Sequence, residues 1–124
     1  MQTAHELYKR LTARLPDTLD LDGKIVMREV LAALAARLTA DEAAELGGDL
    51  PEELGDILAD AHGARGFDRD DLFEHVAERL DLDDDDAESA VLAVMGVLRG
   101  AIVPIVEIEQ VLEVLPPELA QLMR

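Results

Sequence analysis

Leu50-Pro51-Glu52-Glu53-Leu54 recurs 65 residues later as Leu115-Pro116-Pro117-Glu118-Leu119, with its leucines, first proline and last glutamate in the same places. A second pair of segments has the same spacing, because Tyr8–Leu15 is echoed by Phe73–Leu80. The order of the blocks and the phase of their apolar positions agree. We therefore interpret the chain as an internal duplication.

A third pair lies between these blocks and has a shorter spacing. Val30-Leu31-Ala32-Ala33-Leu34 matches Val91-Leu92-Ala93-Val94-Met95, 61 residues on. The difference between the two spacings is about one helical turn, so a helix boundary moves while the packing phase is kept. We expect a single domain over residues 1–124, with internal repeats at about 3–63 and 67–124 related by a pseudo-two-fold axis.

Helical periodicity dominates both halves, and the alternation typical of strands is nearly absent. Thr3 with Glu6 and Thr39 with Glu42 have the spacing of a capping box, and Asp68 is expected to cap a third helix. The expected helices cover about 3–15, 23–38, 39–47, 51–61, 68–80, the segment after the acidic turn 81–86 to about 99, 104–114 and 116–123. The predicted fold class is therefore all-α, a tandem duplicated bundle of two similar units with three to four helices each.

The charge is strongly unbalanced, with 28 acidic residues against 11 basic ones and a net charge of −17. A field of this sign repels nucleic acid and anionic lipid, so we expect neither as a partner. Lysine occurs only at Lys9 and Lys24. Many carboxylates with few lysines suit a protein in concentrated salt, where their repulsion is screened. An ordinary acidic protein from a high-GC genome would have a similar composition, and both interpretations stay open.

Cellular location is constrained by what the sequence lacks. There is no cysteine, which excludes disulfides and thiolate metal sites. The first residues lack the basic-then-apolar pattern of a signal peptide. The longest weakly charged run, 89–106, is interrupted by Gly96, Arg99, Gly100 and Pro104, whereas a membrane span needs about 20 apolar residues. We expect a cytoplasmic protein without membrane association.

An alanine-rich helix followed at a fixed distance by Leu-Pro-x-Glu-Leu occurs twice. In the first half it is formed by 30–43 running into 50–54, and in the second by 73–80, an Ala/Val/Leu helix and 115–119. This arrangement resembles the family named domain of unknown function 2267. The resemblance implies a small all-helical prokaryotic protein, and it supplies no established activity or catalytic residue. The chain departs from the expected pattern in having no tryptophan and few aromatic residues.

The acidic run 81–86 raises the question of a calcium site. An EF-hand loop needs glycine at its sixth position and glutamate at its twelfth. Counted from Asp81, these positions hold Asp86 and Leu92, so the pattern fails. We interpret the run as a solvated turn whose carboxylates cap a helix.

Reactive clusters are also missing from the sequence. His5, His62 and His75 are far apart, and the i, i+4 pair of Asp71 and His75 offers two ligands where a transition metal usually needs three or four. Ser89 is the only serine, and no glycine-rich stretch has the lysine and hydroxyl residue of a phosphate loop. We therefore expect neither a cofactor nor enzymatic activity.

The best candidate for a functional surface is apolar. Its residues are Val30, Leu34, Met95, Ile102, Ile105 and Ile108. They are interpreted either as the core between the two units or as a groove or dimer face. The expected function is a non-catalytic protein-interaction or scaffold module that binds another protein or a second copy. The alternative is a small lipophilic-ligand carrier binding at the seam between the repeats, and an enzyme using Asp or Glu ranks third.

Overall fold

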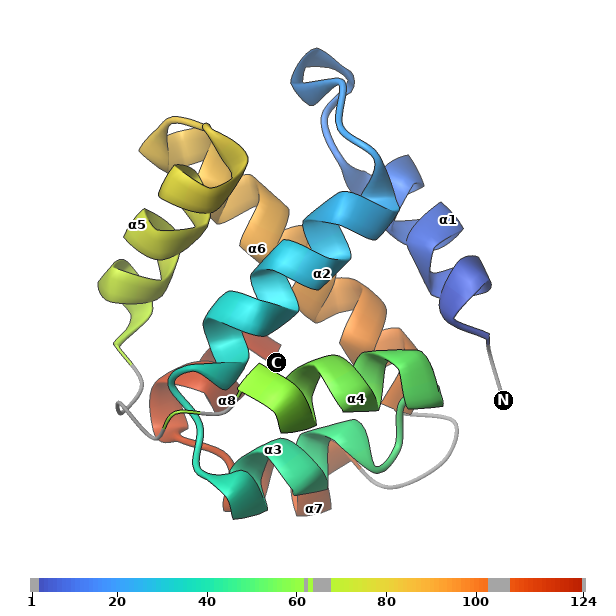
Figure 1. The fold of residues 1–124 in the computed structure, drawn as a ribbon, viewed down its shortest axis with the longest axis vertical. Coiled ribbons are helices and arrows are strands. Elements are labelled where there is room, and N and C mark those ends of the chain that lie inside the picture. The colour runs from blue at the N-terminus through green and yellow to red at the C-terminus, as the bar shows by residue number, and fades with distance from the viewer. Residues whose placement is uncertain (1–2, 62, 64–67, 103–107, 124) are drawn as a thin grey trace.

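The computed structural model describes residues 3–61, 63, 68–102 and 108–123, and all regular structure in these ranges is helical (Figure 1). The elements are α1 (Ala4–Arg14), a short 3₁₀ turn (Asp17–Leu19), α2 (Gly23–Ala35), α3 (Ala40–Gly47), α4 (Glu52–Ala61), α5 (Arg69–Leu80), α6 (Asp84–Ile102), α7 (Ile108–Val114) and α8 (Pro117–Met123). The predicted all-α class is confirmed.

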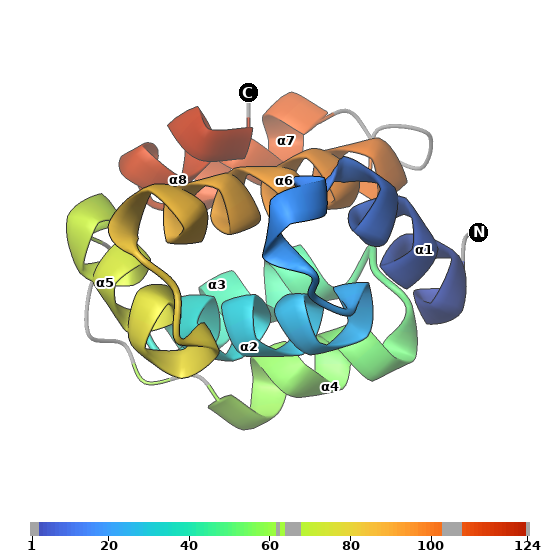
Figure 2. The same ribbon diagram turned by 90° about the horizontal axis from the view of Figure 1, so that it is seen from above.

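The helices form two layers. Figure 2 shows α2, α3 and α4 in one layer and α6, α7 and α8 in the other, with α1 and α5 at opposite ends. The two long helices α2 and α6 contact each other at the centre, and α3 contacts α7. Helix α1 packs against both α2 and α6, and α5 packs against both α6 and α2. Each end helix therefore bridges the two halves of the sequence.

One hydrophobic cluster of buried residues extends through both layers. Helix α2 contributes Val26, Met27 and Val30, and each of these side chains is fully buried. Helix α6 contributes a longer buried face that runs from Ala87 to Ile102. Because apolar residues recur at helical spacing along both helices, each can bury one stripe against the other layer.

The predicted caps are present at three helix starts. The Thr39 hydroxyl accepts from the Glu42 backbone N–H at 3.1 Å, and the Glu42 carboxylate accepts from the Thr39 backbone N–H at 2.9 Å, which completes a capping box. Thr3 caps α1 in the same way, but there Glu6 accepts from the Thr3 hydroxyl instead of its backbone. Asp68 caps α5 by accepting from the Asp71 backbone N–H.

Three helix boundaries differ from the expected ones: the end of α2 and both ends of α6, which begins at Asp84, inside the expected acidic turn 81–86. Helix α2 ends at Ala35, before the expected residue 38. The chain tightens there, because the Arg37 N–H bonds to Leu34 O and the Leu38 N–H bonds to Ala35 O, both at 3.0 Å. Helix α6 continues to Ile102, beyond the expected 99. The expected helix start at 104 lies outside the described residues.

Both long helices are entered through an Asp-Leu-Asp sequence. Asp20 and Asp81 adopt the left-handed conformation, with φ of 47° and 55°. Two residues further on, Asp22 accepts from the Lys24 backbone N–H, and Asp83 accepts from the Asp86 backbone N–H. A left-handed residue turns the chain, and the second aspartate then satisfies a free donor of the new helix.

Helices α1 and α2 approach each other closely at one glycine. The Thr12 hydroxyl donates to Tyr8 O and accepts from the Gly23 backbone N–H, both at 3.0 Å. A Cβ atom at position 23 would overlap Tyr8 O and the Thr12 hydroxyl. Only glycine therefore fits the start of α2 in this position.

Candidate functional site

The apolar residues expected to form a surface or a seam lie mostly inside the protein. Val30, Leu34 and Ile102 are fully buried, and Met95 is 1% exposed. Ile108 is partly buried and packs against the core. Ile105 lies outside the described residues. The buried side chains belong to α2 and α6, which contact each other, so they fill the seam between the halves and do not offer an exposed face.

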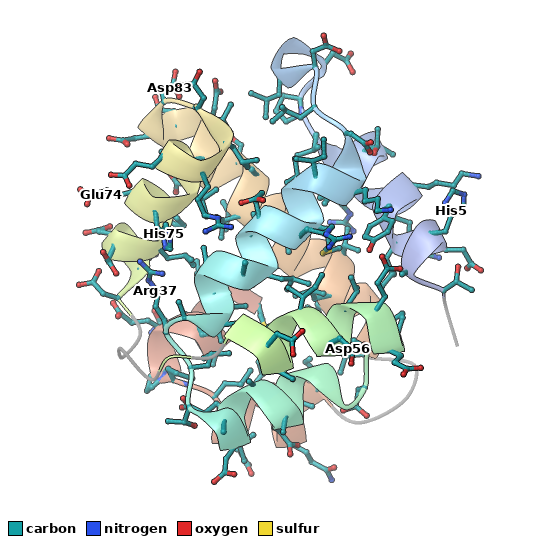
Figure 3. All side chains as sticks on the ribbon, viewed as in Figure 1. His5, Arg37, Asp56, Glu74, His75 and Asp83 are labelled. Carbon is teal, nitrogen blue, oxygen red and sulfur yellow. The ribbon has the colours of Figure 1, made fainter. Side chains whose placement is uncertain are left out.

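A polar cluster at the end of α2 was not predicted from the sequence. Arg37 is 1% exposed, and it is the one buried charged residue within the described ranges. It lies in the tight turn between α2 and α3. Figure 3 shows its side chain next to His75 of α5. A buried guanidinium is costly to desolvate unless it is paired, so its partners determine what this cluster does.

The guanidinium of Arg37 joins α2 to α5. Its Nη1 donates to Ala33 O at 2.7 Å and lies 2.9 Å from His75 Nδ1. Its Nη2 donates to Asp71 Oδ2 at 2.6 Å and to Asp71 O at 3.2 Å. Because a guanidinium has only donors, His75 Nδ1 must accept, and the neutral ring then carries its proton on Nε2.

A small cavity of about 230 Å³ opens beside this cluster. It is lined by Arg37, Asp71, Glu74, His75 and Glu78. Arg37 Nε is buried without a hydrogen-bond partner. In the described part of the chain, no three His, Asp or Glu side chains converge in a way that could hold a metal ion. The cluster brings together one guanidinium, one imidazole and three carboxylates, groups that form hydrogen bonds and bind protons.

The sequence contained a weak signal for this cluster. Applying the 61-residue spacing that relates the two long helices, Arg37 corresponds to Leu98, which is fully buried. An arginine where the other half has a core leucine is an anomaly that could have been noticed. The i, i+4 spacing of Asp71 and His75 was visible in the sequence. Their partner Arg37 could not be identified, because it lies 34 residues before Asp71.

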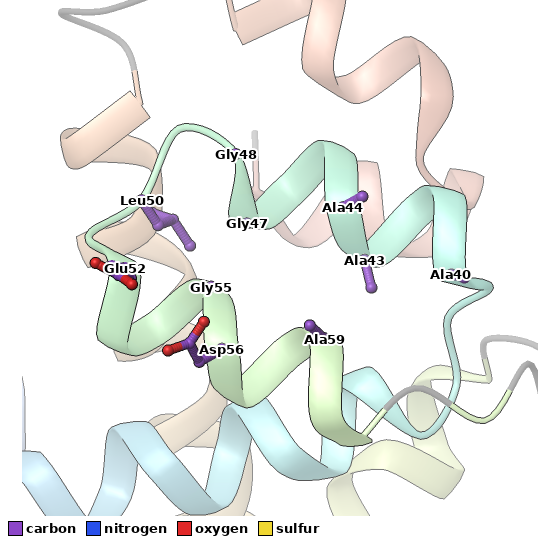
Figure 4. A pocket seen from close by; sticks show the side chains of 10 residues that line it. All are labelled: Ala40, Ala43, Ala44, Gly47, Gly48, Leu50, Glu52, Gly55, Asp56 and Ala59. Atoms are coloured by element: carbon purple, nitrogen blue, oxygen red, sulfur yellow. The ribbon is translucent and has the colours of Figure 1, made fainter.

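A groove of about 440 Å³ lies between α3 and α4 (Figure 4). It is lined by Ala40, Ala43, Ala44, Gly47, Gly48, Leu50, Glu52, Gly55, Asp56 and Ala59. The two helices come close at Gly47 and Gly55, where a Cβ on Gly47 would lie 3.1 Å from Gly55 Cα. All but two of these residues are alanine, glycine or leucine, so the groove is apolar. Glu52 and Asp56 add negative charge on the α4 side.

A larger cleft of about 670 Å³ lies among α5, α6 and α8. Its carboxylates are Asp68, Asp70, Glu74, Asp84, Asp85, Glu88 and Glu118. The other two residues that line it are Arg69 and Phe73, and the guanidinium carbon of Arg69 lies 5.5 Å from the centre of the Phe73 ring. Arg69 also pairs with Glu88 at 3.6 Å. The cleft therefore already holds one cation of the chain itself.

Tyr8, which aligns with Phe73 at the 65-residue spacing of the sequence, is a buried aromatic residue of α1. Its side chain is 7% exposed, and its hydroxyl is buried without a partner in hydrogen-bond geometry. Burial is the main cause that raises the pKa of Tyr8 from 10.0 to about 12. The Glu53 carboxylate adds to the rise, first as an acceptor close to the neutral phenol and then by its negative charge, while Arg28 opposes it. The hydroxyl therefore stays neutral across the physiological range.

Comparison with known proteins assigns the chain to a family. The family described as "Uncharacterized conserved protein (DUF2267)" matches residues 4–122. The chain belongs to this family, as its repeated Leu-Pro-x-Glu-Leu pattern indicated. No curated protein matches the chain. In the ranges that the structure describes, every helix is too short or too polar to cross a membrane.

Proposed function

We propose that the two halves of the chain, about 3–63 and 67–124, arose by duplication and are related by a pseudo-two-fold axis. The axis would place α1, α2, α3 and α4 on α5, α6, α7 and α8, in that order. Within the halves, the contacts α1–α2, α2–α4 and α3–α4 then correspond to α5–α6, α6–α8 and α7–α8. Between the halves, α1–α6 corresponds to α5–α2, and all of these contacts occur. The α2–α6 and α3–α7 contacts convert into themselves. This exchange symmetry supports the axis, which would pass between α2 and α6.

We propose further that the protein is a non-catalytic protein-interaction module, and that the groove between α3 and α4 binds an apolar helix of a basic partner protein. The observation that carries this proposal is a difference between the halves. At the 65-residue spacing, Ala43 and Gly47 of the groove correspond to Ile108 and Leu112. Leu112 is buried and Ile108 packs against the core. The first half thus has small residues at the two positions where the second half has the large apolar side chains of Ile108 and Leu112.

The shape of the groove suits a helix that brings its own large side chains. Ala44 and Ala59 are exposed on its two sides, and small residues let a third helix approach closely. Helix-in-groove recognition places leucine or isoleucine anchors at i, i+3, i+4 and i+7 into such a hollow. A few anchors of this kind supply most of the binding energy of an interface.

Charge complementarity selects the kind of partner. Glu52 and Asp56 line the groove on the α4 side, and the whole chain carries −17. Such a field attracts cationic proteins and speeds their association at low ionic strength. We therefore infer an amphipathic helix whose apolar stripe is flanked by Lys and Arg.

The seam between the halves gives less support to a lipophilic-ligand carrier. Val30, Leu34, Met95 and Ile102 are packed in the core. The α3–α4 groove and the acidic cleft are lined by other residues. A cytoplasmic location stays a proposal, and so does adaptation to concentrated salt, for which the charge of −17 is the support.

A peptide titration tests the groove. The probe is a synthetic amphipathic peptide of leucine and lysine, added to ¹⁵N-labelled protein while amide shifts are recorded. We expect the largest shift changes in α3 and α4. Ala44→Trp fills the groove and should abolish them, whereas Ala13→Trp, at an exposed alanine of α1, should leave them unchanged.

A charge variant distinguishes peptide binding in the groove from nonspecific electrostatic attraction of the peptide to the acidic protein. Asp56→Lys should weaken peptide binding more than Asp17→Lys, because Asp17 is exposed away from the groove. Equal binding by Ala44→Trp and the unchanged protein would refute the proposal. The proposal would also be refuted if the shift changes were spread over the whole acidic surface and disappeared in moderate salt.

A further inference from the structure

The contact between Arg37 and His75 depends on the protonation state of the imidazole. Arg37 Nη1 lies 2.9 Å from His75 Nδ1, and the guanidinium can only donate. A neutral ring can accept this hydrogen bond through Nδ1. A protonated ring has donors on both nitrogens, so it cannot accept, and it would place a second cation against Arg37.

Carboxylates on His75's own helix offer the protonated ring other partners. Asp71, Glu74 and Glu78 line the same cavity as His75. Asp71 precedes His75 by four residues and Glu78 follows it by three, and these spacings bring side chains together on a helix surface. Protonation therefore exchanges a contact between two helices for contacts within α5.

The other helix packed against α5 contributes charge only at a distance from this cavity. Within the described part of α6, no charged side chain lines the cavity beside His75. Asp84, Asp85 and Glu88 line the neighbouring acidic cleft, which Glu74 shares. These carboxylates add to the negative potential on that side of α5, and Arg37 of the turn after α2 is the opposing cation.

A second polar tie connects α2 and α5 one turn further along. Arg79 donates to Glu29, and both side chains are about one third exposed. This ion pair does not involve an imidazole, so it persists through the range in which histidine titrates. Loss of the Arg37–His75 bond would thus weaken one end of α5 without detaching it, because Nη2 of Arg37 still pairs with Asp71 at that end.

We propose that His75 is a pH-responsive latch between α2 and α5. With a neutral ring, His75 holds Arg37 and the two helices stay joined at this end. With a protonated ring, His75 releases Nη1 of Arg37 and turns to carboxylates of α5. The bonds from Nη2 of Arg37 to Asp71 then hold this end of α5 alone, so α5 opens more often there. The device is independent of the groove between α3 and α4, so neither proposal depends on the other.

Amide hydrogen exchange at about pH 5.5 and about pH 8 tests the latch, since Asp and Glu are largely ionised at both values. After correction for intrinsic rates, we expect protection in 72–76 to fall on the order of tenfold at the lower pH, the size expected for one lost hydrogen bond to a charged group. Protection near the centre of α6 should change little.

Two histidine variants provide the comparison. His75→Asn keeps an acceptor close to the position of Nδ1 but does not titrate, so the pH dependence in α5 should disappear. His5→Asn removes an exposed histidine of α1 and should leave that dependence intact. An unchanged pH dependence in His75→Asn would overturn the proposal.

The unmodified protein supplies a readout that does not rely on a variant. Nitrogen NMR at about pH 8 should identify His75 as the tautomer protonated on Nε2, with Nδ1 accepting. A ring that carries its proton on Nδ1 at this pH would exclude the latch, because it could not accept from Arg37.

Discussion

Asp20 and Asp81 lie 61 residues apart and share a left-handed backbone conformation, with φ and ψ of 47° and 47° at Asp20 and 55° and 51° at Asp81. Within the described residues they are the two non-glycine positions with positive φ. Each precedes a leucine and a helix-capping aspartate. Aspartate tolerates this conformation better than most residues, because its short side chain can bond locally.

The two turns should respond alike to substitution. Asp20→Val and Asp81→Val should each lower the free energy of unfolding by about 1–2 kcal/mol, because a β-branched residue strains the left-handed conformation. Asp20→Gly and Asp81→Gly should cost nothing or stabilise slightly. Urea unfolding followed by circular dichroism measures these changes. Asp60→Val, in the helical backbone of α4, is the control, and an equal loss there would contradict the argument.

Two glycines should respond to alanine in opposite directions. Gly23→Ala should destabilise by about 1–3 kcal/mol, because its Cβ meets the Tyr8 carbonyl oxygen and the Thr12 hydroxyl. Gly100→Ala in α6 should stabilise by about 0.5–1 kcal/mol, because nothing lies within 4 Å of its Cβ and alanine favours the helix. Thermal unfolding of the two variants distinguishes them, and a Gly23→Ala protein as stable as the unmodified one would refute the close α1–α2 approach.

Ultraviolet absorbance can follow Tyr8 alone, since the chain has one tyrosine and no tryptophan. The phenol of the folded protein should ionise at about pH 12, and in urea it should ionise near its ordinary pKa of 10.0. Tyr8→Phe should abolish the absorbance change. A folded-state midpoint near 10 would show that the hydroxyl is exposed.

The raised pKa of Tyr8 also determines a pH dependence of stability. The folded state favours the neutral phenol, so its contribution is complete below pH 10.0 and is lost as the pH rises toward about 12. The unmodified protein should therefore lose stability faster than Tyr8→Phe over this interval. Parallel curves for the two proteins, measured by urea unfolding, would contradict this linkage.

The Arg37 cluster should be sensitive to which partner is removed. Asp71→Ala leaves a guanidinium that is 1% exposed without its carboxylate, and it should cost about 1–3 kcal/mol. Arg37→Leu copies the buried Leu98 of the other half and should change stability by less than about 1 kcal/mol, because apolar replacement of a buried ion is often neutral. Chemical unfolding compares them, and a larger loss for Arg37→Leu would show that the charge itself stabilises the fold.

Salt should stabilise the protein. A charge of −17 repels itself in the compact state, and added salt screens this repulsion. Raising sodium chloride from about 0.05 M to about 1 M should increase the melting temperature, with ~1 kcal/mol corresponding to about 4 °C. Sucrose at equal osmolality is the control. An equal rise in sucrose would assign the effect to solvent exclusion and not to charge.

Local signals explain why the helices could be predicted. The side chains of Thr39 and Glu42 each accept from the other's backbone N–H, so four residues of sequence were enough to identify the start of α3. The end of α2 was missed because it is made by backbone bonds from Arg37 to Leu34 and from Leu38 to Ala35, which no residue type in this stretch signals. Apolar periodicity continued through Leu38 and gave no sign of the tight turn.

The candidate surfaces were harder to predict for a similar reason. Val30 and Met95 were recognised as apolar, but periodicity alone could not tell a packed seam from an exposed face. The groove between α3 and α4 depends on Ala43 and Gly47 being small where Ile108 and Leu112 are large. That comparison required the correct spacing between the halves and the knowledge that α3 packs against α4.

The placement of α1 has a consequence for synthesis on the ribosome. Helix α1 packs against α6, whose last described residue is Ile102, so α1 meets one of its neighbours only after α2 to α6 have been synthesised. Until then the apolar stripes of α1 and α2 are partly uncovered in the nascent polypeptide. Such surfaces are recognised by chaperones, and the docking of α1 therefore waits for the synthesis of α6.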